Sequence, residues 1–253
     1  MKVSIITSTY NSAATVSDTL VSVEKQTCLN EIEHIIIDGL SIDNTLNIIK
    51  HFGHVQNVIS EKDNGIYDAM NKGIAIASGD IIGILNSDDF YAHETVIQEI
   101  VEIFKTTGCD AVYGDLIFVH PEKPHKILRK WVAGGYDEKL FLQGWMPPHP
   151  TFFVKKEVYD RLGVFNTQLK SSADYELLIR FMYINKIKVQ YLPDVLVHMR
   201  SGGQSTKSFR NRIKAHKEDY LAWRLNNTKP KWFTLFFKPL RKVKQFLKPH
   251  LKY

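Results

Sequence analysis

A short apolar run that ends in two adjacent aspartates constrains this chain more than any other feature. The segment 81–90 (IIGILNSDDF) is typical of a buried strand of an α/β sheet, followed at once by Asn86, Ser87, Asp88 and Asp89. Neighbouring carboxylates repel each other and are costly to bury without a partner. A divalent cation carrying a phosphorylated ligand would be such a partner, because hard cations prefer oxygen ligands. The simpler alternative for Asp89 alone is a helix cap.

The first half of the chain alternates apolar strands with amphipathic helices. Strands are predicted at 3–6, 33–38, 57–60, 80–85 and 111–119, and helices at 13–26, 43–52, 65–77 and 95–105. This alternation predicts an α/β fold with a mainly parallel sheet flanked by helices. Polar residues follow four of these strands, where ligands bind in such sheets. Each polar group alone could cap a helix or form a turn, but their recurrence predicts one crevice.

The pattern becomes less regular after residue 119. The segment 120–125 reads as a loop, and 131–150 is rich in Gly, Pro and aromatic residues without a clear period. Further helices are predicted at 155–162, 173–184 and 207–225, and short strands at 188–192 and 194–200. We therefore expect one domain at 1–225, divided into a half at 1–119 and a smaller lobe at 120–225, and a tail at 226–253.

Composition indicates a globular protein and places the positive charge in the tail. The 253 residues are 44% hydrophobic, and none of the apolar runs approaches the ~18 residues that cross a bilayer. The N-terminus leads straight into a strand without a secretory signal, and Cys28 and Cys109 have no metal-ligand or redox spacing. Both features predict a cytoplasmic protein with reduced thiols. Nine of the 33 Lys and Arg lie after residue 219, where there is no acidic residue, so the body is slightly acidic.

The tail has the pattern of a segment that lies on a membrane. A helix is predicted at 239–248, opened by Pro239, with Leu240, Val243 and Leu247 on one face and basic residues around them. Aromatic residues precede it, namely Trp232, Phe233, Phe236 and Phe237. We expect a peripheral contact with the anionic inner face of the cell membrane. The alternative is a helix packed on the domain. A nucleic-acid partner is not expected, because no reader motif accompanies the charge.

Four sequence blocks, in this order, resemble the family 2 glycosyltransferases. They are SIITSTYN (4–11), IIIDGLSIDNT (35–45), SEKDNGIYDAMNKGIAIASGD (60–80) and LNSDD (85–89), with weaker continuations at 149–166 and 172–181. The resemblance implies a GT-A fold, with a nucleotide-sugar half at 1–119 and an acceptor half at 120–225. It implies an inverting transfer of a hexosyl or N-acetylhexosaminyl group from a nucleoside-diphosphate sugar, with UDP-sugars favoured. The acceptor would be a hydroxyl of a saccharide or lipid-linked saccharide in cell-surface polysaccharide biosynthesis.

The resemblance also implies roles for individual positions. Asp88 would hold Mn²⁺ or Mg²⁺ on the diphosphate, Asp38 would accept from the base imide, and Asp174 would be the general base. These roles agree with the chemistry, since a departing diphosphate needs its charge neutralised and an attacking hydroxyl must lose a proton. The remaining donor contacts are assigned to Thr7, Thr9, Tyr10, Asn11, Asp63, Lys72, Asn86 and Ser87. The secondary candidates are His198 for the metal and Asp89, His149 and Trp145 for the acceptor, with core packing the alternative for Trp145.

The sequence departs from the family pattern in three places, and these leave alternatives open. Asn86 replaces the first Asp of the D-x-D motif, Met70 stands where many members carry Arg, and Ala173 precedes Asp174 where a second acid is common. A non-catalytic nucleotide-sugar-binding module is therefore one alternative. A nucleotidyltransferase on a similar sheet is another, although the segment 7–11 lacks the glycines and basic residues of a phosphate loop.

Overall fold

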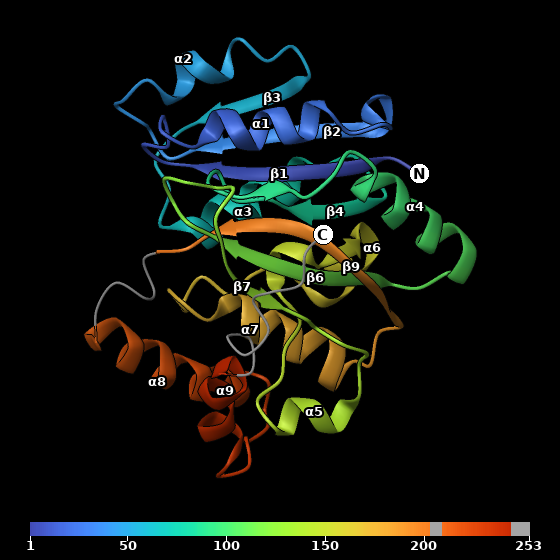
Figure 1. Ribbon diagram of the computed structural model, residues 1–253. Coiled ribbons are helices and arrows are strands. Elements are labelled where there is room, and N and C mark those ends of the chain that lie inside the picture. Colours follow the sequence, from blue (N-terminus) through green and yellow to red (C-terminus); the bar gives the residue numbers. More distant parts are fainter. Residues whose placement is uncertain (203–208, 244–253) are drawn as a thin grey trace.

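Figure 1 shows the computed structural model, which describes residues 1–202 and 209–243. In these residues nine strands form one sheet in the order β3-β2-β1-β4-β8-β6-β9-β5, and β7 pairs with β6. Their bounds are β1 Val3–Thr9, β2 Ile32–Asp38, β3 Val55–Ser60, β4 Ile81–Ile84, β5 Phe90–Tyr91, β6 Ala111–Val119, β7 Ile127–Trp131, β8 Phe153–Lys155 and β9 Val189–Arg200. Strands β1 to β4 are parallel, as predicted, whereas β8 and β5 run antiparallel to their neighbours, so the whole sheet is mixed.

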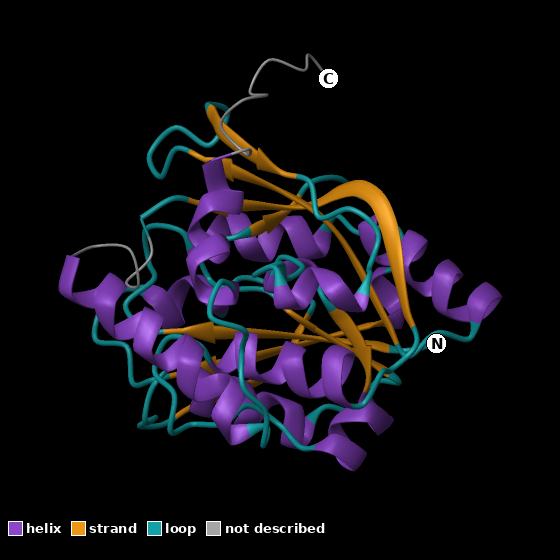
Figure 2. Ribbon diagram, turned by 90° about the horizontal axis from the view of Figure 1, so that it is seen from below, coloured by secondary structure: helices purple, strands orange, loops and turns teal. Residues whose placement is uncertain are grey.

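Helices lie on both sides of this sheet (Figure 2). The α-helices in the described residues are α1 Val16–Glu24, α2 Thr45–Ile49, α3 Ile66–Ile76, α4 Val96–Thr107, α5 Glu138–Leu142, α6 Lys156–Leu162, α7 Ala173–Leu178, α8 Phe209–Leu225 and α9 Thr234–Val243. A π-helix, Ile179–Ile184, continues α7, and 3₁₀ turns lie at Leu29–Glu31 and His149–Thr151. The predicted helices of the first half are therefore confirmed, with shorter ends for α1 and α2.

Both faces of the inner parallel strands β1, β2 and β4 are buried, which explains their largely apolar sequences, whereas the edge strand β3 is mostly exposed. In β1 Ile6 belongs to the hydrophobic cluster that contains residues of α3, α6 and α7, while Ile5 belongs to another cluster that contains residues of α4. Adjacent residues thus serve two cores, because side chains of a strand alternate between its faces. Gly73 lets α3 approach β1 closely, since a Cβ at this position would lie 2.3 Å from Cγ2 of Ile6. The close fit fixes the loop before α3 against the strand ends.

The elements that the sequence did not predict are short or irregular. They are β5, β7, β8 and α5, none longer than five residues. The two strands predicted around Pro193 form one strand, β9, whose pairing with β6 shifts register near Asp115. This shift in register accommodates Pro193, which cannot donate a backbone hydrogen bond to the neighbouring strand. Both cysteines are free, in agreement with the sequence.

The C-terminal helix begins earlier than predicted. Helix α9 starts at Thr234, and Pro239 lies inside it instead of at its first turn. The prediction of a helix start at Pro239 is therefore wrong, and Leu247 falls outside the described residues. The error has a physical cause, since the aromatic run 232–237 continues the helix in the N-terminal direction and Pro239 is tolerated within it. Within residues 1–202 and 209–243, no helix has the length and apolar character needed to span a bilayer.

Candidate active site

The carboxylate of Asp38 joins the ends of three parallel strands. It accepts hydrogen bonds from the hydroxyl of Thr9 on β1 (2.9 Å), from the backbone N–H and hydroxyl of Ser41 after β2, and from the hydroxyl of Ser60 on β3 (2.7 Å). Burial alone would raise the pKa of Asp38, but these hydrogen bonds outweigh it and lower the pKa below its ordinary value. Asp38 is thus an ionised, fully buried hub with four intramolecular donors. A contact with a base imide stays a prediction, and it would require one of these donors to be exchanged.

An open aromatic face lies beside this hub. Tyr10 directly follows β1, is 62% exposed, and its ring approaches Gly39 just after β2. A Cβ at Gly39 would lie 2.5 Å from an Asp63 carboxylate oxygen, so any other residue here would displace the Asp63 side chain from this position. The other oxygen of Asp63 accepts from the N–H of Gly65 at 2.9 Å. The structure thus brings two of the predicted donor-binding residues, Tyr10 and Asp63, to one glycine.

Hydrogen bonds connect the β1 end to the β2 and β4 ends as well. The N–H of Asn11 donates to the Ser41 hydroxyl at 2.8 Å, and the Asn11 side-chain oxygen accepts from the N–H of Ile42 at 2.9 Å. The hydroxyls of Ser12 and Ser87 lie 2.8 Å apart. Asn11 has a φ of 49°, a left-handed conformation that Asn tolerates better than most residues. The polar strand ends therefore form one connected rim, and the crevice expected at these strand ends stays a prediction.

The turn after β4 separates the two aspartates into different environments. Asp89 is fully buried, and its carboxylate accepts from the amide of Asn86 (3.0 Å) and from the N–H of Arg200 (3.3 Å). Burial and the neighbouring Asp88 raise the pKa of Asp89 well above its ordinary value. Asp89 therefore supports the turn from inside, and its complete burial argues against the predicted contact with the acceptor.

Asp88 lies at the partly open side of the same turn. Burial raises its pKa, and the nearby Arg200 guanidinium opposes this rise. The side-chain oxygen of Asn86 is buried and has no hydrogen-bond partner among the described residues. Because the Asn86 amide nitrogen donates to Asp89, its oxygen is fixed as an acceptor that lacks a donor. The turn thus offers an unpaired amide oxygen and a carboxylate, both of which suit Mn²⁺ or Mg²⁺, so the residues present fit a divalent cation.

Arg200, which the sequence analysis did not single out, holds this turn in place. Its guanidinium, only 5% exposed, donates to the backbone oxygen of Asp88 at 2.7 Å and forms an ion pair with Asp18. It also lies over the Phe90 ring, 5.2 Å from its centroid. A signal in the sequence could have identified Arg200. It is a basic residue at the end of one predicted strand, and an acidic doublet that it could pair with follows a different predicted strand.

Asp174 lies in the first turn of α7, beside the loop that precedes α3. The hydroxyl of Tyr67 donates to Asp174 at 3.2 Å. Burial, followed by the charge of Asp174, raises the pKa of Tyr67 well above its ordinary value, so the phenol keeps its proton and remains a donor. Tyr67 is four residues from Asp63, so the α3 N-terminus connects the donor rim with Asp174. Sequence reasoning missed this role, although Tyr67 lies within the third quoted block.

The predicted acceptor histidine lies in the same neighbourhood. The ring of Phe165 packs against Tyr67 (centroids 5.5 Å apart) and against His149 (5.3 Å). Burial lowers the pKa of His149, and the charge of Asp174 opposes this effect. His149 is therefore a buried, neutral neighbour of Asp174 instead of an exposed loop residue.

Four other candidates have partners within the protein, so the ligand contacts expected of them stay predictions. The Thr7 hydroxyl lies 3.0 Å from His34 Nε2, and complete burial lowers the pKa of His34 to about 3. A nucleotide contact by Thr7 stays a prediction and would require this hydroxyl to leave His34. The Lys72 ammonium forms an ion pair with Glu61 at 2.8 Å. The other two are Trp145, whose Nε1 donates to the Ala133 carbonyl in the core, and His198, whose ring packs edge-on against Phe90.

Met70, the residue in place of the family arginine, belongs to the core. It is 3% exposed and packs in the cluster that joins α3 to the sheet. Its side chain therefore does not reach the rim, and the basic group near the aspartate turn is Arg200 instead.

A parallel βα half with polar strand ends, followed by a mixed half, defines a GT-A glycosyltransferase fold. The chain superposes on a fragment of S. aureus TarS in complex with UDP-GlcNAc with a TM-score of 0.69 at 18% identity, covering 89% of this chain and 65% of that one. It superposes on the mannosyltransferase PcManGT from Pyrobaculum calidifontis, in complex with GDP-Man and Mn²⁺, with a TM-score of 0.65 at 18% identity, covering 97% and 69%. These two likenesses confirm the predicted fold.

The family model described as Glycosyl transferase family 2 matches residues 4–166, so the chain belongs to this family. The protein is a glycosyltransferase. A PGL/p-HBAD biosynthesis glycosyltransferase of Mycobacterium bovis is 29% identical over 205 residues, covering 79% of this chain and 77% of the relative. An uncharacterized glycosyltransferase of Mycobacterium tuberculosis is 30% identical over 197 residues, covering 70% and 68%. The predicted family is thereby confirmed.

Proposed function

We propose that this protein transfers a sugar from a nucleoside-diphosphate sugar to a hydroxyl of a saccharide or lipid-linked saccharide, with inversion at the anomeric carbon. The observation that carries the proposal is the Asn86–Asp89 turn, where a buried acceptor without a donor lies beside a carboxylate with a raised pKa. A bound Mn²⁺ or Mg²⁺ would neutralise charge that develops on the departing diphosphate. Asn86 and Asp88 are the residues that would hold it.

The donor nucleotide would lie along the rim of strand ends. Tyr10 offers an exposed ring on which a base can stack, and Asp63 and Asn11 provide polar groups around it. TarS and PcManGT are described with UDP-GlcNAc and GDP-Man, which supports a nucleotide-sugar donor. We favour a UDP-linked hexose or N-acetylhexosamine.

Asp174 would act as the general base. As the acceptor hydroxyl oxygen bonds to the anomeric carbon, the bond from that carbon to the diphosphate oxygen breaks, and Asp174 takes the hydroxyl proton. Attack from the face opposite the leaving group inverts the anomeric centre. The Tyr67 hydroxyl positions the carboxylate, because its hydrogen bond to Asp174 uses one oxygen and leaves the other available. We also propose that the half at 120–225 binds the acceptor.

A panel of nucleotide sugars tests the proposed function. At about 100 times its dissociation constant, the correct donor should stabilise the fold by about 2.7 kcal/mol and raise Tm by about 5–10 °C. The stabilisation should require Mn²⁺ or Mg²⁺ and disappear in EDTA, as measured by differential scanning fluorimetry. Stabilisation by a nucleoside triphosphate, with none from any nucleotide sugar, would instead indicate a nucleotidyltransferase.

The acceptor-side surface carries a feature that fits a membrane. Helix α9 packs on the body through Thr234, which donates to the Leu142 carbonyl, and Lys238, which pairs with Asp219 at 2.6 Å. Large apolar residues are exposed just before this helix and on its other side, namely Trp232 (89%) before it and Phe236 (62%), Phe237 (41%) and Leu240 (46%) within it. Helix α9 therefore both packs on the domain and exposes apolar residues, so the two alternatives for the tail are combined in one helix. The sequence of the tail 226–253 adds positive charge. We propose that this face rests on the anionic inner leaflet, where a lipid-linked acceptor would be presented.

Changing the exposed aromatic residues should weaken vesicle binding without unfolding the protein. Replacing Trp232 and Phe236 together by Ser removes side chains that each contribute about 1.5–3 kcal/mol when buried, so binding to phosphatidylglycerol vesicles should fall by about tenfold or more. Co-sedimentation measures this affinity, and Tm should stay unchanged because both residues are exposed. Val132→Ser, an exposed apolar residue elsewhere (59%), is the matched control. Equal vesicle binding by the double variant would rule out this contact.

A further inference from the structure

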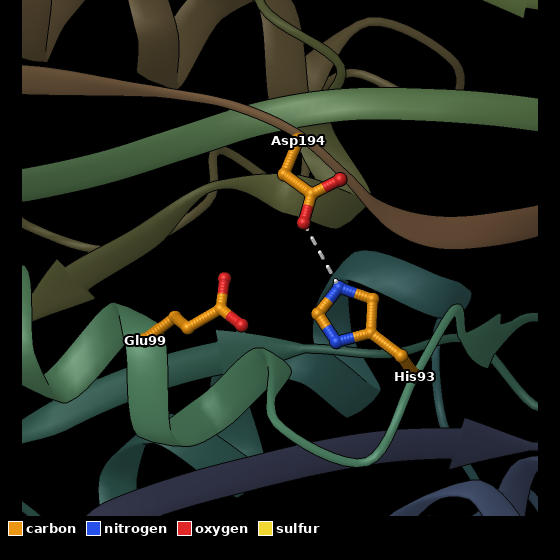
Figure 3. Close-up of side chains that lie close together, drawn as sticks. All are labelled: His93, Glu99 and Asp194. Atoms are coloured by element: carbon orange, nitrogen blue, oxygen red, sulfur yellow. Dashed lines mark ion pairs between the residues drawn. The ribbon is translucent and has the colours of Figure 1, made fainter.

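A second group of possible metal ligands follows β5, on the other side of that strand from the Asn86–Asp89 turn. It consists of His93 in the β5–α4 connection, Glu99 on α4 and Asp194 on β9 (Figure 3). One candidate ligand atom from each residue lies within 4.8 Å of the others, and His93 Nε2 is 3.2 Å from Asp194 Oδ2. Within residues 1–202 and 209–243, this is the one group of three such side chains close enough to hold an ion.

The hydrogen bonds of Thr95 determine which nitrogen of His93 carries a proton. The Thr95 hydroxyl lies 2.6 Å from Glu99 Oε1 and 2.9 Å from His93 Nδ1. A carboxylate only accepts, so the single hydroxyl proton points to Glu99, and the hydroxyl must accept from Nδ1. Nδ1 is therefore protonated, which leaves Nε2 with a lone pair in the neutral ring. Thr95 occupies the N-cap of α4 without capping it, so its hydroxyl is committed to this pair.

A cation can take the place of the proton between His93 Nε2 and the carboxylate of Asp194. The two atoms lie 3.2 Å apart and form an ion pair when the ring is protonated, whereas two acceptors face each other when Nε2 keeps its lone pair. Nε2 is shielded from solvent and has no hydrogen-bond partner among the described residues. We propose that His93, Glu99 and Asp194 bind a divalent cation of the zinc class at this position, independently of the cation at the Asn86–Asp89 turn.

The ligand set and its spacing point to zinc instead of magnesium. Zinc binds imidazole nitrogen and carboxylate oxygen at about 2.0–2.2 Å, so two tetrahedral ligands lie about 3.3 Å apart, a separation that the 3.2 Å between His93 Nε2 and Asp194 Oδ2 permits. Magnesium prefers oxygen ligands in octahedral geometry. The Nδ1–H to Thr95 hydrogen bond matches the outer-shell partner that orients metal-bound histidines. A bound ion would link α4, β9 and the β5–α4 connection.

Zinc binding to the whole protein, measured in excess Mg²⁺ by equilibrium dialysis with atomic absorption, tests the proposal. We expect one Zn²⁺ per chain, lost in His93→Asn and in Asp194→Asn. Thr95→Val keeps all three ligands but removes the partner of Nδ1, so its affinity should fall by about 10–100-fold. His125→Asn, which changes an exposed histidine, and Asp88→Asn should keep the site, which separates this ion from the one at the aspartate turn.

Two results would overturn the inference. The first is the lack of a saturable site, or a site that persists in both ligand variants. The second is an NMR spectrum in which the His93 ring carries protons on both nitrogens at neutral pH and does not respond to Zn²⁺, because His93 and Asp194 would then form an ordinary ion pair. Neither result would bear on sugar transfer.

Discussion

Replacing Asp174 by Asn should reduce the turnover rate of sugar transfer by about 10²–10⁴-fold, the usual contribution of a general base. The amide cannot take the acceptor proton, but its oxygen can still accept the hydrogen bond from Tyr67, so the local structure should persist. Transfer is measured with the donor selected by the nucleotide-sugar panel, and donor affinity should stay unchanged because the proposed role of Asp174 is confined to the acceptor hydroxyl.

The control for this variant is Asp160→Asn, which makes the same chemical change at an exposed residue paired only with Lys156. Its activity should equal that of the unmodified protein. Full activity in Asp174→Asn would remove the base assignment. A parallel loss of donor affinity would show that Asp174 supports the donor site instead.

Replacing Asp88 by Asn should reduce transfer by about 10²–10³-fold, a typical cost of removing one group that stabilises charge in the transition state. The stability of the fold should move the other way. Asp88 raises the pKa of the buried Asp89, so removing its charge relieves repulsion within the turn, and Tm should stay constant or rise.

The Asp88→Asn variant is informative because transfer should fall while Tm stays constant or rises. A structural role for Asp88 would lower Tm together with activity, whereas a role in holding the diphosphate lowers activity alone. The companion variant Asp89→Asn should lower Tm, since Asp89 accepts from Asn86 and Arg200 inside the protein. Unchanged turnover in Asp88→Asn with a stable fold would contradict the proposed function of the turn.

The parallel half of the fold was predictable because three of its four strands, β1, β2 and β4, are buried on both faces. Ile5 and Ile6 face different cores, so the strand reads as an unbroken apolar run that ends where polar residues are needed. Strand β5, two residues long, leaves no such pattern, and the pairing of β9 with β6 depends on contacts between distant segments. The start of α9 was mispredicted because a proline after an aromatic run resembles a helix start.

The site was predictable as a set of strand ends but not as a set of contacts. Asp38 ends a strand and Asp63 and Asp88 follow strands, and parallel strands bring such residues to one edge. Two hydrogen bonds, from Tyr67 to Asp174 and from Arg200 to the Asp88 backbone oxygen, join residues more than 100 positions apart. No local sequence pattern encodes such contacts. The complete burial of Asp89 was equally hidden, because two adjacent aspartates in sequence do not reveal which one faces inward.

The most direct measurement titrates the nucleoside diphosphate of the selected donor into the protein by calorimetry, in Mn²⁺ and in EDTA, for the unmodified chain and for Asp88→Asn. We expect Mn²⁺ to tighten binding at least about tenfold in the unmodified chain, which corresponds to about 1.4 kcal/mol, and to have no effect in the variant. Equal affinities in Mn²⁺ and EDTA for the unmodified chain, or an undiminished Mn²⁺ effect in Asp88→Asn, would contradict the account.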